Sequence, residues 1–257
     1  MLIFSLSAIV GVVVGLLGAG GSIMTTPLFL YVEDMPPLEA ISSSLLVVAA
    51  ASSLALFRHG MRGHIQWRVG IIFGVSGMFS GFLGGQVGAH LPERVLLFAF
   101  SIIMAITGFA MIRRRKNSVA RSPFKPKTYR LILDGALVGF VTGIVGAGGG
   151  FMVVPALVLF GGLAIKDAIA TSLLVVIMKC FGNFAGFALK FNDGSLVSLN
   201  TQISFDFKVI LLAILGASIG SIIGSIFSTK VKSEKLSIVF GWFVILIASF
   251  IFIENLG

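Results

Sequence analysis

Long apolar runs dominate the chain, and each is about 20 residues long, the length at which a helix crosses about 30 Å of hydrocarbon. They are apolar on all sides, whereas the strands of a membrane β-barrel alternate apolar and polar residues. The sequence therefore predicts an all-α polytopic membrane protein. The runs cover residues 38–57, 69–89, 95–112, 168–189, 209–227 and 236–253.

The chain contains an internal repeat. Residues 11–32 read GVVVGLLGAGGSIMTTPLFLYV and residues 139–160 read GFVTGIVGAGGGFMVVPALVLF, an offset of 128 (139 minus 11). The register continues from AISSSLLVV at 40–48 to AIATSLLVV at 168–176, and it shifts to about 136 after a longer loop in the second copy. Fixed-offset self-similarity is the signature of duplicated architecture. We therefore predict a first transmembrane repeat at 1–112, a linker at 113–130 and a second transmembrane repeat at 131–257.

Each repeat opens with an interrupted apolar segment. About 16 apolar residues precede a Gly-Ala-Gly-Gly break, and the apolar stretch beyond it is only about 11 residues long, too short for a span at 1.5 Å per residue. A broken helix or a re-entrant hairpin is expected, followed by three transmembrane helices. Irregular backbone at membrane depth is tolerated only where protein buries it or water reaches it. Matching breaks in two halves indicate a transporter's binding site.

Positive charge favours one topology. Eight of the nineteen Lys and Arg residues lie in 113–130. If the hairpins are re-entrant, the halves are inverted, and fifteen basic residues face the cytoplasm against three outside. If each break belongs to an ordinary span, the halves are parallel and the counts are thirteen and five. The positive-inside rule prefers inverted repeats in the inner or plasma membrane, with the linker at 113–130 cytoplasmic.

The composition excludes several other classes of function. The chain of 257 residues is 57% hydrophobic, so its net charge of +9 has no soluble domain with which to bind nucleic acid. His59, His64 and His90 lie near span ends without metal-ligand spacing, and the single Cys180 forms no CxxC site. No paired membrane carboxylates, P-loop or GxSxG motif is present. We therefore expect no enzyme, metal or cofactor.

The two copies of the break, GLLGAGGSIMTTPLFL and GIVGAGGGFMVVPALVLF, each followed by A-I-x-[ST]-S-L-L-V-V, resemble the TauE/SafE sulfite exporter family. The similarity covers nearly the whole chain. It implies a membrane permease for a small anion such as sulfite or sulfoacetate. The halves differ at one place that matters: Ser22, Thr25 and Thr26 correspond to Gly150, Val153 and Val154.

The candidate substrate site begins at the two breaks. Helix N-termini carry unpaired N–H groups and partial positive charge, which favour an anion. The alternative is that these glycines only permit a tight turn and close packing. The break residues assigned to the site are Gly18, Ala19, Gly20, Gly21, Ser22, Thr25, Thr26, Gly146, Ala147, Gly148, Gly149 and Gly150.

Lys179 is the one basic residue deep within an apolar run. Burying a cation in a bilayer costs about 2.5 to 3.5 kcal/mol on insertion scales, and no carboxylate lies at matching depth. We expect its partner to be the substrate anion, with Asn183 one turn along on the same face. The alternative is a lysine that snorkels to the membrane interface.

Hydroxyl clusters open the spans after each hairpin, and Ser43, Ser44, Thr171 and Ser172 could complete the coordination of an anion. Their alternative roles are N-capping and interhelical hydrogen bonding. The sequence thus predicts a permease that moves a small sulfur-containing anion outward through the lipid bilayer, and a homodimer is compatible with it. The competing hypothesis is a non-transporting accessory membrane protein of a complex.

Overall fold

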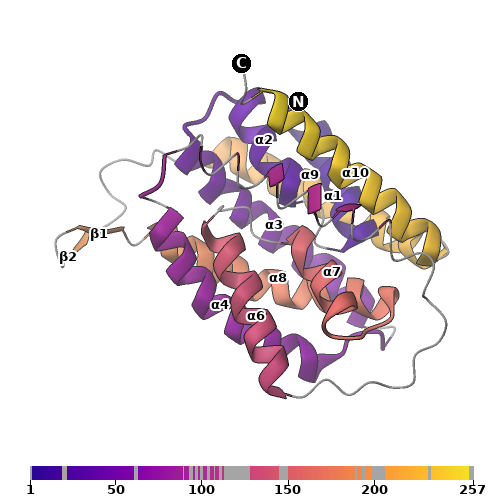
Figure 1. Ribbon diagram of the computed structural model, residues 1–257. Helices are drawn as coiled ribbons and strands as arrows, with labels where there is room; N and C mark the ends of the chain where they lie inside the picture. The colour runs from indigo at the N-terminus through magenta and orange to yellow at the C-terminus, as the bar shows by residue number, and fades with distance from the viewer. Residues whose placement is uncertain are drawn as a thin grey trace.

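A computed structural model gives the arrangement of the chain. Besides separate residues between 95 and 112, it describes residues 2–18, 22–60, 63–88, 90–92, 128–144, 150–188, 190–192, 195–197, 206–230 and 233–254. The protein is helical throughout this part, apart from one short β-hairpin in the longer loop of the second copy (Figure 1). The elements are α1 (Leu2–Leu17), α2 (Ser22–Val32), α3 (Pro37–Gly60), α4 (Trp67–Gly88), α6 (Thr128–Ile144), α7 (Gly150–Leu159), α8 (Ile165–Ala188), β1 (Lys190–Asn192), β2 (Ser195–Val197), α9 (Phe207–Lys230) and α10 (Ser233–Glu254).

The long helices confirm the prediction of a polytopic helical membrane protein. Within the described residues, four helices are long and apolar enough to cross a membrane, and they match four of the predicted runs. The predicted run at 236–253 lies within α10, which is 22 residues long. The four spans are Glu39–Gly60, Trp67–Gly88, Ile165–Ala185 and Phe207–Phe227.

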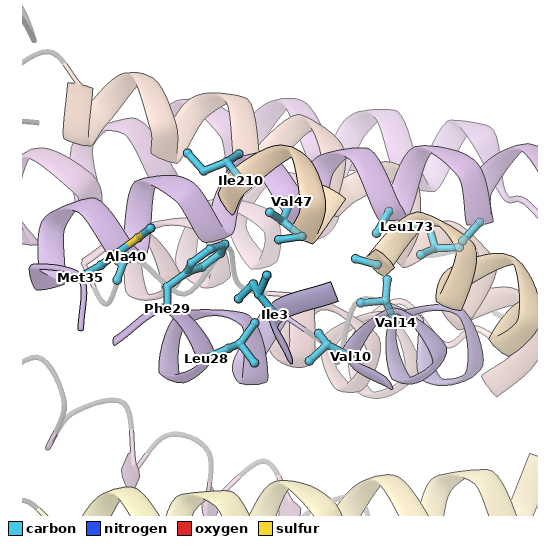
Figure 2. Packing of buried hydrophobic residues seen from close by; sticks show 14 residues of the cluster. Ile3, Val10, Val14, Leu28, Phe29, Met35, Ala40, Val47, Leu173 and Ile210 are labelled. Atoms are coloured by element: carbon cyan, nitrogen blue, oxygen red, sulfur yellow. The ribbon is translucent and has the colours of Figure 1, made fainter. Parts of the chain in front are cut away.

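The described helices are interrupted where the sequence predicts the two breaks, and residues 19–21 and 145–149 of these breaks lie outside the described residues. α1 ends at Leu17 and α2 begins at Ser22, while α6 ends at Ile144 and α7 begins at Gly150. Gly18 follows α1 with a φ of 72°. This left-handed backbone conformation is common in the residue after a helix, and residues other than glycine rarely adopt it. In the first half the chain then folds back, because Ile3 at the start of α1 lies with Leu28 and Phe29 of α2 in one apolar cluster (Figure 2).

Glycines bring the first helix of each half against the fourth helix of the other half. A Cβ on Gly139 or Gly143 of α6 would collide with the backbone of α4 at Gly77 and Gly81. Residue numbers rise together along this contact, so α4 and α6 run in the same direction, side by side as Figure 1 also shows. Such close approach is how helices associate in lipid, where no hydrophobic drive acts between them.

The same contact recurs between α1 and α9. Gly11 of α1 abuts the backbone of Ala217, and Gly15 abuts that of Ser221, again with both helices running in the same direction. Gly11 and Gly15 are the repeat equivalents of Gly139 and Gly143, 128 residues earlier. The two halves are therefore interlocked rather than packed as separate units.

The helices that follow the hairpins, α3 and α8, lie in the middle of the molecule (Figure 1). α8 also runs in the same direction as α4, because Gly70 lies against Leu174 and Gly81 against Asn183. The loop between α3 and α4 docks on the beginning of α8. His64 Nδ1 lies 3.1 Å from Asp167 Oδ1.

Charged residues separate toward the two ends of the bundle. Where α3 ends and α4, α6 and α8 begin, the chain carries Arg58, Arg68, Arg130 and Lys166. We call this the basic end; it also holds Asp167. At the opposite end Glu39 in the first turn of α3 interacts electrostatically with Asp206, just before α9. We call this the acidic end, and it also carries Glu33, Asp34 and Lys208.

The last helix packs against the end of the first half. The rings of Phe98 and Phe252 are 4.9 Å apart, and Gly108 lies against Gly241 of α10. Because position 98 meets position 252 while 108 meets 241, the described residues of 95–112 run antiparallel to α10. The closing segments of the two halves therefore pack on each other.

Candidate functional site

One face of α8 carries three polar side chains inside the bundle. Ser172, Lys179 and Asn183 are spaced by seven and four residues, which places them in a single row along the helix. All three are 0% exposed. At 1.5 Å per residue, Ser172 and Lys179 are about 10 Å apart along the axis.

Lys179 is held by α6. Its Nζ donates a hydrogen bond of 2.6 Å to Thr142 Oγ1 and lies 3.5 Å from the carbonyl oxygen of Val138. The Thr142 hydroxyl in turn donates to the Val138 carbonyl at 2.7 Å. Both acceptors belong to the last two turns of α6, just before the second break. The lysine is fully covered by protein, so snorkelling to the interface does not describe it.

The two described acceptors of Lys179 are neutral groups of the protein. Neither acceptor is a carboxylate, so within the described residues no negative charge balances the ammonium. Only two of its three N–H donors reach a described acceptor. A cation that is bonded but not neutralised is suited to receive a small anion.

Asn183 is buried with an unsatisfied amide. Among the residues that the structure describes, neither its Nδ2 nor its Oδ1 has a hydrogen-bond partner. Its Oδ1 lies close to Gly81 of α4, where a Cβ would displace it, and Gly77 similarly makes room for the stem of Lys179. A buried polar group without a partner is costly, so the amide of Asn183 is available to bond to a group that the described residues do not supply.

The first break reaches the start of the same polar row. A Cβ on Gly18 would meet the Ser172 hydroxyl and the backbone of Ile169. Ser172 itself donates to the Ile169 carbonyl at 2.7 Å. Gly18 in the break of the first half thus contacts α8 of the second half. The contact lies at one end of the polar row, and Lys179 and Asn183 lie at the other end.

The hydroxyls of the first half form a separate group. Thr26 of α2 and Ser44 of α3 are hydrogen-bonded at 2.9 Å, and Ser44 also donates to the Ile41 carbonyl at 2.7 Å. Thr25 is 1% exposed. Ser43 is fully buried, and its hydroxyl has no hydrogen-bond partner within the described part of the chain. Of the alternative roles considered for these hydroxyls, Ser44 therefore has that of an interhelical hydrogen bond.

The hydroxyl clusters of α3 and α8 do not cap the N-termini of these helices. α3 begins at Pro37 and α8 at Ile165, so Ser43, Ser44, Thr171 and Ser172 lie one or two turns inside their helices. Thr171 Oγ1 accepts a hydrogen bond of 3.0 Å from the backbone N–H of Gln66. Its bond therefore fastens the loop between α3 and α4.

Several residues assigned to the site from the sequence lie outside the described residues. They are Ala19, Gly20 and Gly21 of the first break and Gly146, Ala147, Gly148 and Gly149 of the second. Ser22 and Gly150 are placed as the first residues of α2 and α7.

Thr142 is the residue that the sequence analysis missed. It is 2% exposed and accepts the strongest hydrogen bond of Lys179. A signal was available, because Thr142 is the one polar residue in the stretch GFVTGIV before the second break, and its counterpart in the first copy is Val14.

Comparison with known proteins concerns the chain as a whole. The family model for the sulfite exporter TauE/SafE matches residues 3–251. A probable membrane transporter protein of Xylella fastidiosa is 33% identical over 95% of this chain and 91% of its own length. YdhB, a probable membrane transporter protein of Bacillus subtilis, is 25% identical over 92% of this chain and 93% of its own. No solved structure matches.

The fold and these relatives define a multi-pass helical membrane transporter rather than an enzyme. The chain belongs to the sulfite exporter TauE/SafE family.

Proposed function

We propose that this transporter carries a small sulfur-containing anion, such as sulfite or sulfoacetate, out of the cell by way of Lys179. The observation that carries the proposal is a fully buried ammonium whose described partners are a hydroxyl and a carbonyl, with the unsatisfied amide of Asn183 one turn away. A charge kept at that cost in a membrane protein is expected to serve the substrate pathway. The family's name supplies the sulfur chemistry.

The two halves are proposed to be inverted repeats. α6 opens the second half in the same direction as α4, and α1 opens the first half in the same direction as α9. The beginning of α8 lies beside the loop after α3, so that α3 ends where its repeat equivalent starts. Inverted halves rocking about a shared site are a common basis of alternating access.

The basic end is proposed to face the cytoplasm in the inner or plasma membrane, together with the linker at 113–130. Cytoplasmic loops carry an excess of Lys and Arg, and the acidic end would then lie outside. Arg130 and Lys208 are exposed at opposite ends. Single cysteines at these two positions, in a Cys180→Ser background, should be labelled by a membrane-impermeant thiol reagent from opposite sides. Labelling of both from one side would contradict the topology.

Export is the direction favoured by the membrane potential. An interior that is negative by about 100 mV favours outward movement of each negative charge by about 2.3 kcal/mol. The described carboxylates of the long helices lie in their first two turns or at the end of α10, so none is placed at mid-span to relay protons. Outward flux should therefore depend on an imposed potential. A flux indifferent to potential but strictly dependent on a pH gradient would contradict this mechanism.

Proteoliposomes provide the decisive test. The purified chain should carry one or more of sulfite, thiosulfate and sulfoacetate, and Lys179→Met should abolish the flux while the variant stays folded in detergent. Lys208→Met makes the same chemical change at an exposed site and is the matched control. Folded wild-type protein that carries none of these anions would favour an accessory role instead. Undiminished flux in Lys179→Met would remove this residue from the pathway.

A further inference from the structure

We infer that the site selects anions bearing a single negative charge and discriminates against dianions. The inference rests on the proposed function and narrows its substrates. Sulfite should be carried as hydrogen sulfite, together with monovalent sulfonates, whereas sulfate and doubly charged sulfite should be carried poorly. Sulfoacetate, whose sulfonate and carboxylate make it a dianion, is then no longer among the proposed substrates. The argument is a balance of charge in the described interior.

Lys179 supplies at most one positive charge. Of the other ionisable side chains buried in the described residues, Cys180 next to Lys179 carries a thiol, which adds no positive charge. Glu39 lies in the first turn of α3 and His59 in its last, at the two ends of the bundle. The elements packed on the polar face of α8 bring Gly77, Gly81, Val138 and Thr142 to Lys179 and Asn183. None of these four residues titrates. A second negative charge would therefore have no counter-charge at this position.

The helix termini at the breaks do not supply the missing charge. A helix N-terminus carries roughly half a positive charge and a C-terminus roughly half a negative charge. Each break joins the C-terminus of one helix to the N-terminus of the next, α1 to α2 and α6 to α7. The partial charges of each break oppose one another. Lys179 moreover lies against the C-terminal turns of α6, which cannot add to its positive field.

The remaining polar groups at the site are neutral. Asn183 offers an N–H donor and a C=O acceptor, and neither has a partner among the described residues. An acceptor beside an ammonium is unfavourable for a bare oxyanion, but it can receive the O–H of a protonated one. The pair formed by Lys179 and Asn183 is thus complementary to an anion with one charged and one protonated oxygen. An unbalanced charge in a low-dielectric site is strongly disfavoured.

The test compares three anions in proteoliposomes over a range from mildly acidic to mildly alkaline pH. Methanesulfonate stays a monoanion and sulfate a dianion throughout, while sulfite changes between the two forms. At each pH we expect methanesulfonate flux to be at least about tenfold above sulfate flux, because only the dianion leaves a charge unbalanced. The ratio of sulfite flux to methanesulfonate flux should rise on acidification in proportion to hydrogen sulfite.

Each outcome bears on one claim. Sulfate carried as fast as methanesulfonate, or sulfite flux that is greatest at alkaline pH, would overturn the selection of monoanions and leave anion transport intact. A ratio of sulfite flux to methanesulfonate flux that does not change with pH would also overturn it, because any pH dependence would then belong to the protein rather than to the substrate. No flux of any of the three anions, nor of thiosulfate, would instead reject the proposed function. In Asn183→Leu, the preference for hydrogen sulfite over methanesulfonate should fall toward one, and an unchanged preference would overturn the role of the amide.

Discussion

The contact between α6 and α8 corresponds, in the internal sequence repeat, to the contact between α1 and α3. The two contacts differ in the polarity of their buried side chains. In the second half Thr142, Lys179 and Asn183 are buried polar residues. Their equivalents, 128 residues earlier, are Val14, Ala51 and Ala55, and all three are buried in an apolar cluster. The backbone arrangement thus persists in both halves, while the charged group occurs in one of them.

The glycines show the opposite behaviour. Gly11 and Gly15 of the first half and Gly139 and Gly143 of the second make the same close helix contact. In both halves this contact buries the glycine face of the first helix against the other half. A buried ammonium has no such structural requirement, and its presence in only one half is what we expect of a residue that serves a single substrate.

The largest effect should come from placing the charge in the wrong half. Ala51→Lys introduces a long cation into a tightly packed apolar site beside Val14. An uncompensated buried charge typically costs about 3 to 5 kcal/mol, so folded protein should be largely lost. Thermal unfolding in detergent measures this, and adding Val14→Thr should restore part of the loss. A fully stable Ala51→Lys protein would show that the two sites do not differ as described.

The close helix contact should be nearly as sensitive, and equally so in both halves. In Gly143→Val the new side chain collides with the backbone of α4, and in Gly15→Val with that of α9. Overpacking commonly costs about 1 to 3 kcal/mol, and contacts with rigid backbone fall at the upper end. Similar losses of thermal stability are expected for the two variants. A tolerated change at one position alone would break the equivalence of the two contacts.

Removing the hydroxyl that holds Lys179 should affect transport more than stability. Thr142→Val restores the residue type of the first half and leaves the ammonium with the Val138 carbonyl alone. We expect about a tenfold lower rate of anion flux, since a mispositioned group at a site can cost this much or more. Thr142→Ser should retain most of the flux. Equal loss in both variants would mean that packing, not the hydroxyl, is what matters.

The smallest effect is expected at the basic end. His64 and Asp167 are paired, but their side chains are 42% and 30% exposed. Exposed ion pairs contribute about 0 to 1 kcal/mol and weaken with salt. Asp167→Asn should therefore shift the unfolding temperature only slightly, and the shift should shrink at high ionic strength. Glu39→Gln changes the repeat equivalent, which faces Asp206 rather than a histidine, and should not destabilise the protein.

Features that depend on residues close together in the sequence could be predicted from it. Apolar length located the spans, and the repeated Gly-Ala-Gly-Gly located both breaks. The burial of Lys179 and its place on one face with Asn183 followed from spacing. The hydrogen bond from Lys179 to Thr142 could not be predicted in this way, because the two residues are 37 positions apart on different helices. Helical spacing within one helix does not determine how two helices are rotated relative to each other.

The interlocking of α1 with α9 also constrains how the chain is made. Residues 11 and 15 enter the membrane early in synthesis, but their partner backbone at Ala217 and Ser221 follows about 200 residues later. Until then the glycine face of α1 has only lipid or insertion machinery beside it. We therefore expect the first half on its own to be incompletely packed and to be degraded by quality-control proteases. Two separately expressed halves, divided within the linker at 113–130, have matching surfaces through which to assemble in one bilayer.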